Sequence, residues 1–289
     1  MTKSPAFAKW LILILLSLIW GSSFILIKKG LAGFGFVEAA SIRLMAGGLA
    51  FLPIGIWNFN KIPREKWPYL FLITLIGMFI PAFLFCLAQQ HVQSSVAGIL
   101  NALTSVFTFV FSIFLFKKTY KTSHVLGLLL GLASAVILIL ERSDAAFTLN
   151  IYAGLIVLAT IFYGLNINLV KHKLHDVPAI ALSSVSVSIA GLLAFLFVFL
   201  PRHENYAMTA ERWWPMAALV TLGIMSTGLA TVLYYKLIKI TSALFASSTT
   251  FVMPIVAVMW GLLDGELFNW VHALSIVGIL TAVVLIRKA

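Results

Sequence analysis

Charged residues are scarce in this chain. They make up 10% of its 289 residues, while hydrophobic residues make up 62%, whereas soluble domains carry roughly 25% charged residues. Cysteine is almost absent as well, and the single Cys86 lies within an apolar run. These shortages exclude a soluble globular domain, a disulfide framework and a CxxC metal site.

Catalytic motifs are also missing. The sequence holds no HExxH motif, no P-loop pattern and no GxGxxG pattern, and its six histidines fall at the ends of apolar runs or between them. There is no paired acid and base and no cluster of metal ligands in the pattern. An enzyme is therefore disfavoured, and no cofactor or metal is expected.

Acidic residues avoid the middle of every apolar run. Proton-coupled carriers often use a carboxylate embedded in the membrane, and this sequence offers none at that depth. Any proton coupling is therefore confined to groups near the ends of the runs, for which Glu38, His91 and Glu266 are the candidates. Uncoupled transport or exchange is an equally good interpretation.

The chain does contain long apolar runs. A window of about 19 residues predicts ten membrane spans, each near the ~20 residues that an α-helix needs to cross ~30 Å of hydrocarbon. The expected spans are residues 8–29, 36–57, 67–88, 95–116, 122–140, 149–171, 178–200, 213–236, 242–263 and 268–286. The predicted fold class is therefore all-α integral membrane, with ten transmembrane helices.

Basic residues set the expected orientation. With the N-terminus inside, fourteen of the twenty Lys and Arg residues fall in the inner connectors, and seven of the nine Asp and Glu residues fall outside. This pattern satisfies the positive-inside rule and predicts that both termini are cytoplasmic. The net charge of +11 is explained by this topology and by anionic lipid of the inner leaflet. Membrane lipid is thus an expected partner, and nucleic acid is not.

The two halves of the chain resemble one another. Residues 20–24 read WGSSF and lead to Lys28, while residues 163–167 read YGLNI and lead to Lys171, with a Gly-to-Lys spacing of seven in both. This similarity predicts two five-helix repeats, residues 1–145 and 146–289, and because five is odd the second repeat must be inverted. Inverted repeats are typical of secondary carriers, whose substrate site lies near the bilayer midplane between the repeats.

Polar side chains inside the expected spans are candidates for substrate contact, because polar groups in hydrocarbon are costly. The candidate cavity residues are Trp20, Ser22, Ser23, Gln89, Asn101, Thr104, Tyr163, Asn166, Asn168, Tyr234, Ser248 and Thr249. For serine and threonine the alternative is helix–helix packing, where small polar residues let backbones approach. Both interpretations stay open for the asparagines, whose amides have four hydrogen-bonding positions to satisfy.

Three charged residues form a candidate outer mouth, namely Lys28, Arg43 and Glu266. Lys28 can extend toward the interface, and Arg43 can extend there or pair with Glu38. The functional alternative is that one or both attract an anionic group such as a carboxylate. Pro81 and Pro254 lie inside expected spans, where each removes a backbone hydrogen bond. Such a break either bends a helix around a cavity or is an inert kink.

These features together resemble the EamA family of the drug/metabolite transporter superfamily. The resemblance is carried by residues 20–24 with Lys28, by Arg43 and Ala46-Gly47, by Pro254 and by Gly265-Glu266. It implies a ten-helix carrier of two inverted repeats, similar to exporters of amino acids and related metabolites. It also implies a central cavity built by expected spans 1, 3, 4, 6, 8 and 9. One departure is that Lys117-Lys118 stands where the second half has Gly265-Glu266.

Pattern and resemblance thus predict a secondary transporter that exports small polar metabolites such as amino acids by alternating access. The expected location is the inner membrane of a bacterium. The alternative is a non-transporting membrane scaffold or lipid-binding protein, which needs no polar cavity. Short connectors suit a monomer and a homodimer equally.

Overall fold

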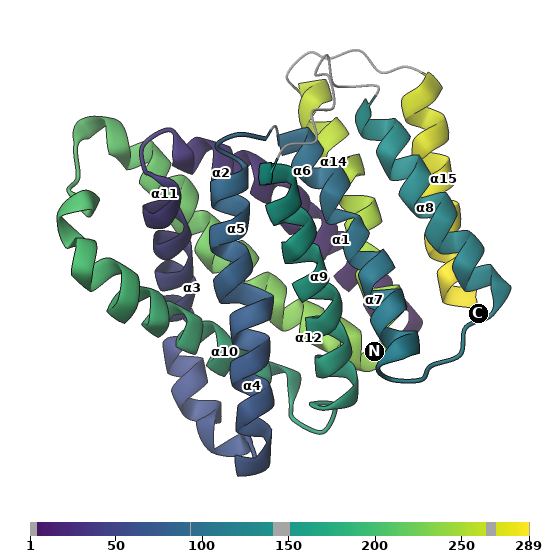
Figure 1. Ribbon diagram of the computed structural model, residues 1–289, viewed down its shortest axis with the longest axis horizontal. Coiled ribbons are helices and arrows are strands. Elements are labelled where there is room, and N and C mark those ends of the chain that lie inside the picture. Colours follow the sequence, from purple (N-terminus) through teal and green to yellow (C-terminus); the bar gives the residue numbers. More distant parts are fainter. Residues whose placement is uncertain (1–4, 93, 141–150, 264–269, 289) are drawn as a thin grey trace.

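The computed structural model describes residues 5–92, 94–140, 151–263 and 270–288, and these residues fold into a bundle of helices without a strand (Figure 1). Helices suit these long apolar runs in hydrocarbon, because a helix satisfies its backbone N–H and C=O groups within its own segment. The predicted all-helical class is therefore confirmed for the described residues.

Six helical segments are long and apolar enough to cross a membrane. They are Phe7–Leu31, Phe36–Lys61, Arg64–Ala88, Ile151–His172, Ala179–Glu204 and Ala210–Ile240, and they coincide with six of the expected spans. The other four expected spans coincide with shorter apolar helices, Leu103–Phe114, Thr122–Ile137, Ala243–Val256 and Trp270–Ile286. The count of ten spans and the cytoplasmic placement of the termini stay predictions.

The described part of the first half contains eight α-helices. They are α1 (Pro5–Gly21), α2 (Ser23–Leu31), α3 (Phe36–Asn58), α4 (Trp67–Thr74), α5 (Ile80–Ala88), α6 (Ser94–Asn101), α7 (Leu103–Phe114) and α8 (Thr122–Leu140). A wide π-helical turn, η3 (Leu75–Phe79), joins α4 to α5, and the short 3₁₀ turns η1 (Phe59–Lys61) and η2 (Arg64–Lys66) lie between α3 and α4.

The second half contains seven described α-helices. They are α9 (Ile151–His172), α10 (Ala179–Ala194), α11 (Trp213–Thr221), α12 (Ala230–Ile240), α13 (Ala243–Ser247), α14 (Thr249–Leu263) and α15 (Trp270–Lys288). Two further wide turns are η4 (Phe195–Phe199) after α10 and η7 (Leu222–Leu229) between α11 and α12, and the 3₁₀ turns η5 (Leu200–Tyr206) and η6 (Ala210–Arg212) lie between them.

Several long helical segments are interrupted, and the interruptions fall at similar places in both halves. The segment of α6 and α7 breaks at Ala102, and the segment of α13 and α14 breaks at Ser248. The segment of α4 and α5 contains the wide turn η3, and the segment of α11 and α12 contains the wide turn η7. Wide turns of this kind are frequent at functional sites, and all four interruptions lie beside the cavity described below.

The two halves meet where small residues let backbones touch. Helix α3 packs against α10 and η7. A Cβ added to Gly191 would lie 2.7 Å from the Cα of Gly48, and a Cβ added to Gly47 would lie 2.7 Å from the carbonyl oxygen of Gly223. Close approach through small residues is how helices associate without a hydrophobic driving force. This contact fixes α3 of the first half against the second half.

Both chain termini lie in the lower half of the view in Figure 1, together with the connectors that follow α7 and α9. Helices α8 and α15 pack side by side at one flank of the bundle.

Candidate binding cavity

A cavity of about 130 Å³ lies between the two halves of the chain. Its wall is formed by α1, α2, α3, η3, α5, α6 and α7 from the first half and by α9, η7, α12 and α14 from the second. A volume of this size holds on the order of ten waters. The cavity therefore suits a small molecule, and neither half encloses it alone.

Eight of the residues singled out from the sequence lie on the cavity wall. They are Trp20, Ser23, Arg43, Asn101, Thr104, Tyr163, Asn166 and Tyr234. The structure brings these side chains together from seven different helices. Their role in substrate contact stays a prediction.

Other candidates lie away from the wall. Ser22 accepts a hydrogen bond of 2.8 Å from Nε1 of Trp260. The hydroxyls of Ser248 and Thr249 donate to the carbonyls of Phe245 and Ala246, at 2.6 and 2.8 Å. These serine and threonine hydroxyls are therefore satisfied by local partners, as the packing alternative requires.

The remaining candidates also fall outside the wall. Gln89 accepts a weak hydrogen bond of 3.4 Å from Ser94, and its Nε2 has no described partner. Lys28 is exposed at the end of α2. Glu266 lies outside the described residues. Arg43 lies in the cavity wall, and a shared outer mouth of these three residues stays a prediction.

Asn168 belongs to a buried hydrogen-bond network beside the cavity. Its Nδ2 donates to the carbonyls of Thr108 and Gly164, both at 2.9 Å, and its Oδ1 accepts from Ser112 at 2.6 Å. The side chain is fully buried. The amide thus joins α7 to α9, which gives it a structural role.

Polar groups of each half donate hydrogen bonds to the other half, at or next to its wide turn. From α1 and α2, Nε1 of Trp20 donates to the carbonyl of Ser226 at 3.2 Å and Ser23 donates to the Ser226 hydroxyl at 2.9 Å. From α9, Nδ2 of Asn166 donates to the carbonyl of Ile73 at 3.0 Å, just before η3. The turn has room for this amide only because residue 77 is glycine, since a Cβ there would lie 2.1 Å from Nδ2 of Asn166.

The two proline candidates differ in their surroundings. Pro81 is buried directly after η3, at the start of α5. It lacks the N–H that would bond the carbonyl of Gly77 in a regular helix, and Gly77 lines the cavity. Pro254 lies inside α14, one residue from the cavity-lining Met253. Only Pro81 adjoins a wide turn.

The interrupted helices of the two halves contact each other at their breaks. The Ser105 hydroxyl donates to the carbonyl of Ser247 at 2.8 Å and lies 3.2 Å from Oγ1 of Thr250. Nδ2 of Asn101 lies 3.6 Å from Sδ of Met253. These contacts join α6 and α7 to α13 and α14 at the cavity.

Two polar groups of the wall have little hydrogen bonding within the protein. Oγ1 of Thr104 has no described partner although the residue is only 2% exposed. The amide of Asn101 is buried, and its only described partner is a sulfur atom, which is a weak acceptor. Buried polar groups are normally satisfied, so these two groups are available to a bound molecule.

Arg43 brings a positive charge to the wall. Its Nε and Nη2 donate to the same atom, Oγ1 of Thr227, at 3.3 and 3.2 Å. The Cys86 thiol and the Tyr163 hydroxyl lie close enough to Arg43 to interact electrostatically with its guanidinium. Among the lining residues, all of which belong to the described part of the chain, Arg43 is the only charged side chain.

Aromatic rings form much of the remaining wall. Trp20 and Tyr234 meet edge to face with centroids 4.7 Å apart, and Phe85 stacks on Tyr163 at 6.0 Å. Both pairs join one half of the chain to the other. The wall therefore combines a cation, hydroxyl and amide groups, and apolar rings.

Several wall residues were not among the candidates named from the sequence. Those that carry polar groups and lie in η7 or α12 are Ser226, Thr227 and Thr231. The available signal was the Ser-Thr pair at 226–227, which interrupts the apolar run 213–236. The apolar members of the wall, such as Met78 and Ile167, carry no sequence signal that separates them from core residues.

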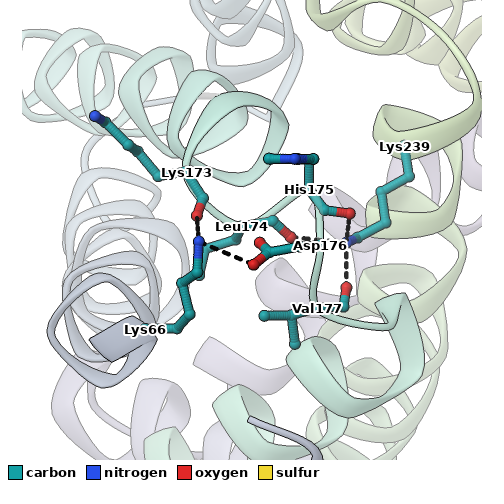
Figure 2. A network of polar contacts seen from close by, with 7 residues as sticks. All are labelled: Lys66, Lys173, Leu174, His175, Asp176, Val177 and Lys239. Carbon is teal, nitrogen blue, oxygen red and sulfur yellow. Dashed lines mark hydrogen bonds and ion pairs between the residues drawn. The ribbon is translucent and has the colours of Figure 1, made fainter. Parts of the chain in front are cut away.

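A polar network surrounds the connector between α9 and α10 (Figure 2). Nζ of Lys66 lies 3.0 Å from Oδ2 of Asp176 and donates to the carbonyl of Lys173 at 3.0 Å. Nζ of Lys239 donates to the carbonyls of Leu174 and His175, at 2.8 and 3.0 Å, and to that of Val177. Two lysines from separate segments therefore hold the connector between α9 and α10, which we call the inner clamp (Lys66, residues 173–177 and Lys239).

The charge of Asp176 is stabilised within the inner clamp. Desolvation acts to raise its pKa, but the hydrogen bond and charge of Lys66, with the nearby His175, outweigh it and hold the pKa below its ordinary value. Asp176 is therefore ionised throughout the neutral range.

Comparison with known proteins places the chain in a family. The model of the EamA-like transporter family matches residues 8–140 and again residues 150–288. A solved structure, titled only as the crystal structure of a protein, superposes with a TM-score of 0.77 over 97% of this chain and 96% of that one, at 18% identity. At that identity the likeness shows the fold alone.

Curated relatives have similar lengths and transporter names. An uncharacterized inner membrane transporter of Escherichia coli K12, YedA, is 26% identical over 94% of this chain and 88% of its own length. An uncharacterized transporter of Archaeoglobus fulgidus is 23% identical over 88% of each chain. An uncharacterized transporter of Bacillus subtilis, YdfC, is 24% identical over 83% of this chain and 78% of its own length.

The two family matches cover nearly the whole chain, and six helical segments of its described part are long and apolar enough to cross a membrane. The protein is thus an integral membrane protein that belongs to the EamA-like transporter family.

Proposed function

We propose that the protein is a secondary transporter that exports small polar metabolites, such as amino acids, across the inner membrane of a bacterium. The observation that carries this proposal is the cavity between the two halves, with polar groups from both halves on its wall. Trp20, Ser23, Tyr163 and Asn166 lie near the middle of long apolar segments, where polar groups are retained for function.

The arrangement of the wall supports alternating access. The contacts of Trp20 and Ser23 with Ser226, and of Asn166 with Ile73, cross between the halves. A movement of one half against the other therefore changes the wall itself. Two inverted repeats that rock about a central site are the usual device of secondary carriers, and we assign that motion to residues 1–145 and 146–289.

The inner clamp supports a state in which one end is closed. Lys66 belongs to the first half, and the connector that it holds belongs to the second. Under the predicted topology this end faces the cytoplasm, so the described conformation is closed on the cytoplasmic side. Export requires this clamp to open so that substrate can enter from the cytoplasm.

The relatives support the location and the general activity. YedA is named an inner membrane transporter, and a bacterial inner membrane is the location that we propose here. Export and amino acids as substrates rest on the resemblance of the sequence to exporters of that kind. The lining residues include no carboxylate, which favours facilitated transport or exchange over proton coupling within the cavity.

The test is uptake by proteoliposomes containing the purified protein, against a panel of labelled amino acids, nucleosides and sugars, with and without a pH gradient. Saturable flux of one class supports the proposal. Absence of flux for every compound, from protein shown to be folded, favours the alternative of a non-transporting scaffold or lipid-binding protein.

The variant Asn101→Ala sharpens this test. Its amide is poorly satisfied within the protein, so its removal should weaken substrate binding by roughly 5- to 100-fold, as expected for one lost hydrogen bond to a ligand. The thermal stability should be unchanged, because the only described partner of the amide is the sulfur of Met253. Unaltered flux in this variant would remove Asn101 from the substrate site.

A further inference from the structure

We infer that Arg43 is the carboxylate-binding residue of the cavity, and that the substrate must carry a carboxylate while its amino group is not recognised. This inference rests on the proposed transport function and specifies its substrate class as small monocarboxylates, of which neutral amino acids are one kind.

The first observation is the depth of Arg43. Seven residues separate it from Phe36 at the beginning of α3, which corresponds to about 10 Å along a helix. Its guanidinium lines the cavity instead of extending to the end of the helix. Cations near helix ends normally extend to the interface, so an arginine aimed inward needs another reason.

The second observation is the incomplete hydrogen bonding of the guanidinium. A guanidinium has five N–H donors arranged in a planar fork. Both described hydrogen bonds of Arg43 go to one hydroxyl, that of Thr227, and they are long, at 3.2 and 3.3 Å. Thr227 thus anchors one edge of the fork. The neighbouring Cys86 thiol is a weak acceptor.

The third observation is the charge balance of the wall. The lining residues include no Asp or Glu to neutralise Arg43. A charge in a low-dielectric site is costly unless it is paired. A carboxylate supplies one negative charge and two acceptor oxygens in the geometry that a guanidinium binds bidentately. A bound carboxylate therefore satisfies both the charge and the free donors of Arg43.

The same balance argues against recognition of an ammonium group. A substrate ammonium would find no carboxylate on the wall, and Arg43 would repel it. The unsatisfied hydroxyl of Thr104 and the amide of Asn101 can both donate and accept hydrogen bonds. They suit a neutral polar substituent such as a hydroxyl as well as an amino group. A 2-hydroxy acid should therefore bind at least as well as the amino acid of the same shape.

The test measures binding to the purified protein in detergent, by calorimetry at constant chloride concentration. Four probes share one branched apolar group: valine, 2-hydroxy-3-methylbutanoate, the primary amide of that hydroxy acid, and 2-methylpropylamine, which is valine without its carboxylate. The variants are Arg43→Gln, Arg43→Lys and the matched control Lys29→Gln. Lys29 is exposed at the end of α2, so its change removes the same charge outside the cavity.

The parent protein and Lys29→Gln should bind the two carboxylates, with the amide and the amine at least about 30-fold weaker, the scale of a lost buried charge partner. Arg43→Gln should lose this preference, and Arg43→Lys should keep part of it, because lysine supplies charge without the fork. Three results would each overturn the inference. The parent could bind the amide or the amine as tightly as the hydroxy acid, Arg43→Gln could bind the carboxylates as tightly as the parent does, or the parent could bind neither carboxylate.

Flux of the same probes into proteoliposomes separates this inference from the proposed function. Carboxylate binding that depends on Arg43, without any flux, would overturn the transport function and leave the binding site in place. Saturable flux of other compounds, with no dependence on Arg43, would overturn the inference and leave the transport function.

Discussion

At the scale of single residues, three asparagines from the apolar runs have three different surroundings. Asn101 lies on the cavity wall with a weak partner, Asn166 bonds the backbone beside a wide turn, and Asn168 completes a buried network. The sequence left substrate contact and helix packing open for all three, because an amide in an apolar run has four hydrogen-bonding positions to satisfy. It could not separate them, since all but one of their described partners lie 56 to 152 positions away, such as Ser112 and Met253.

Asn168→Ala should destabilise the protein without changing substrate selectivity. Three hydrogen bonds are lost, two to backbone carbonyls and one from Ser112. Two of these bonds join α9 to α7, and interhelical hydrogen bonds in membranes contribute about 0.6 kcal/mol each on average, so the expected loss is about 1 kcal/mol in the free energy of unfolding. Denaturant unfolding in detergent measures it. Unchanged stability would show that the network joining α7 to α9 carries no net energy.

At the scale of helices, the sequence predicted where apolar segments run but not where they are interrupted. Pro81 and Pro254 were equal candidates for a break, yet only Pro81 adjoins a wide turn. The breaks at Ala102 and Ser248 have no proline at all. They form where helices of the two halves meet, as in the bond from Ser105 to the carbonyl of Ser247. Tertiary contacts of this kind cannot be read from local propensity.

Gly191→Ala should weaken the contact between α3 and α10. The added Cβ would lie 2.7 Å from the Cα of Gly48 and 2.9 Å from the carbonyl oxygen of Leu44, and backbone atoms cannot rotate away. Overpacking of this kind costs about 1–3 kcal/mol in the free energy of unfolding. Because Leu44 adjoins Arg43, displacement of α3 should also weaken carboxylate binding.

Gly154→Ala is the matched control for this substitution. No atom lies within 4 Å of a Cβ added there, and alanine is favoured over glycine inside a helix by about 0.5–1 kcal/mol. This variant should be as stable as the parent or slightly more so. Equal effects of the two substitutions would contradict the close approach of α3 and α10.

At the scale of the whole molecule, the sequence predicted a membrane protein of two similar halves, and the family model matches each half. The inner clamp was not predicted. Lys239 is held by backbone carbonyls of the connector after α9, and a charge pattern cannot identify carbonyls as partners. The topology stays a prediction, since the count of spans and the side of the termini depend on the membrane itself.

Asp176→Asn should loosen the inner clamp. Removal of the ion pair with Lys66 favours opening of this end, and a partly exposed pair contributes about 1 kcal/mol or less. The apparent affinity for substrate offered from the clamp side should therefore rise by up to about five-fold, as the binding-competent population grows. Lys29→Gln provides the control for a remote change of charge. A lower affinity from this side would contradict the assignment of the clamp as a closure.

The effect of Asp176→Asn should also be independent of pH in the neutral range. The folded pKa of Asp176 is lowered, so the contribution of the pair is complete above the ordinary value of about 3.9. It is lost only as the pH falls through the lowered value. The ratio of affinities, variant to parent, should be the same at pH 6 and pH 8. A ratio that approaches one at pH 6 would show that the clamp titrates there.

The central claim is that the cavity between the halves opens to each side in turn. Counterflow in proteoliposomes tests it most directly: vesicles are loaded with unlabelled 2-hydroxy-3-methylbutanoate, and entry of the labelled compound is followed at low outside concentration. The account predicts a transient accumulation of label above equilibrium that saturates with substrate and is lost in Arg43→Gln. Entry that only equilibrates, without stimulation by the internal pool, would contradict an alternating-access carrier.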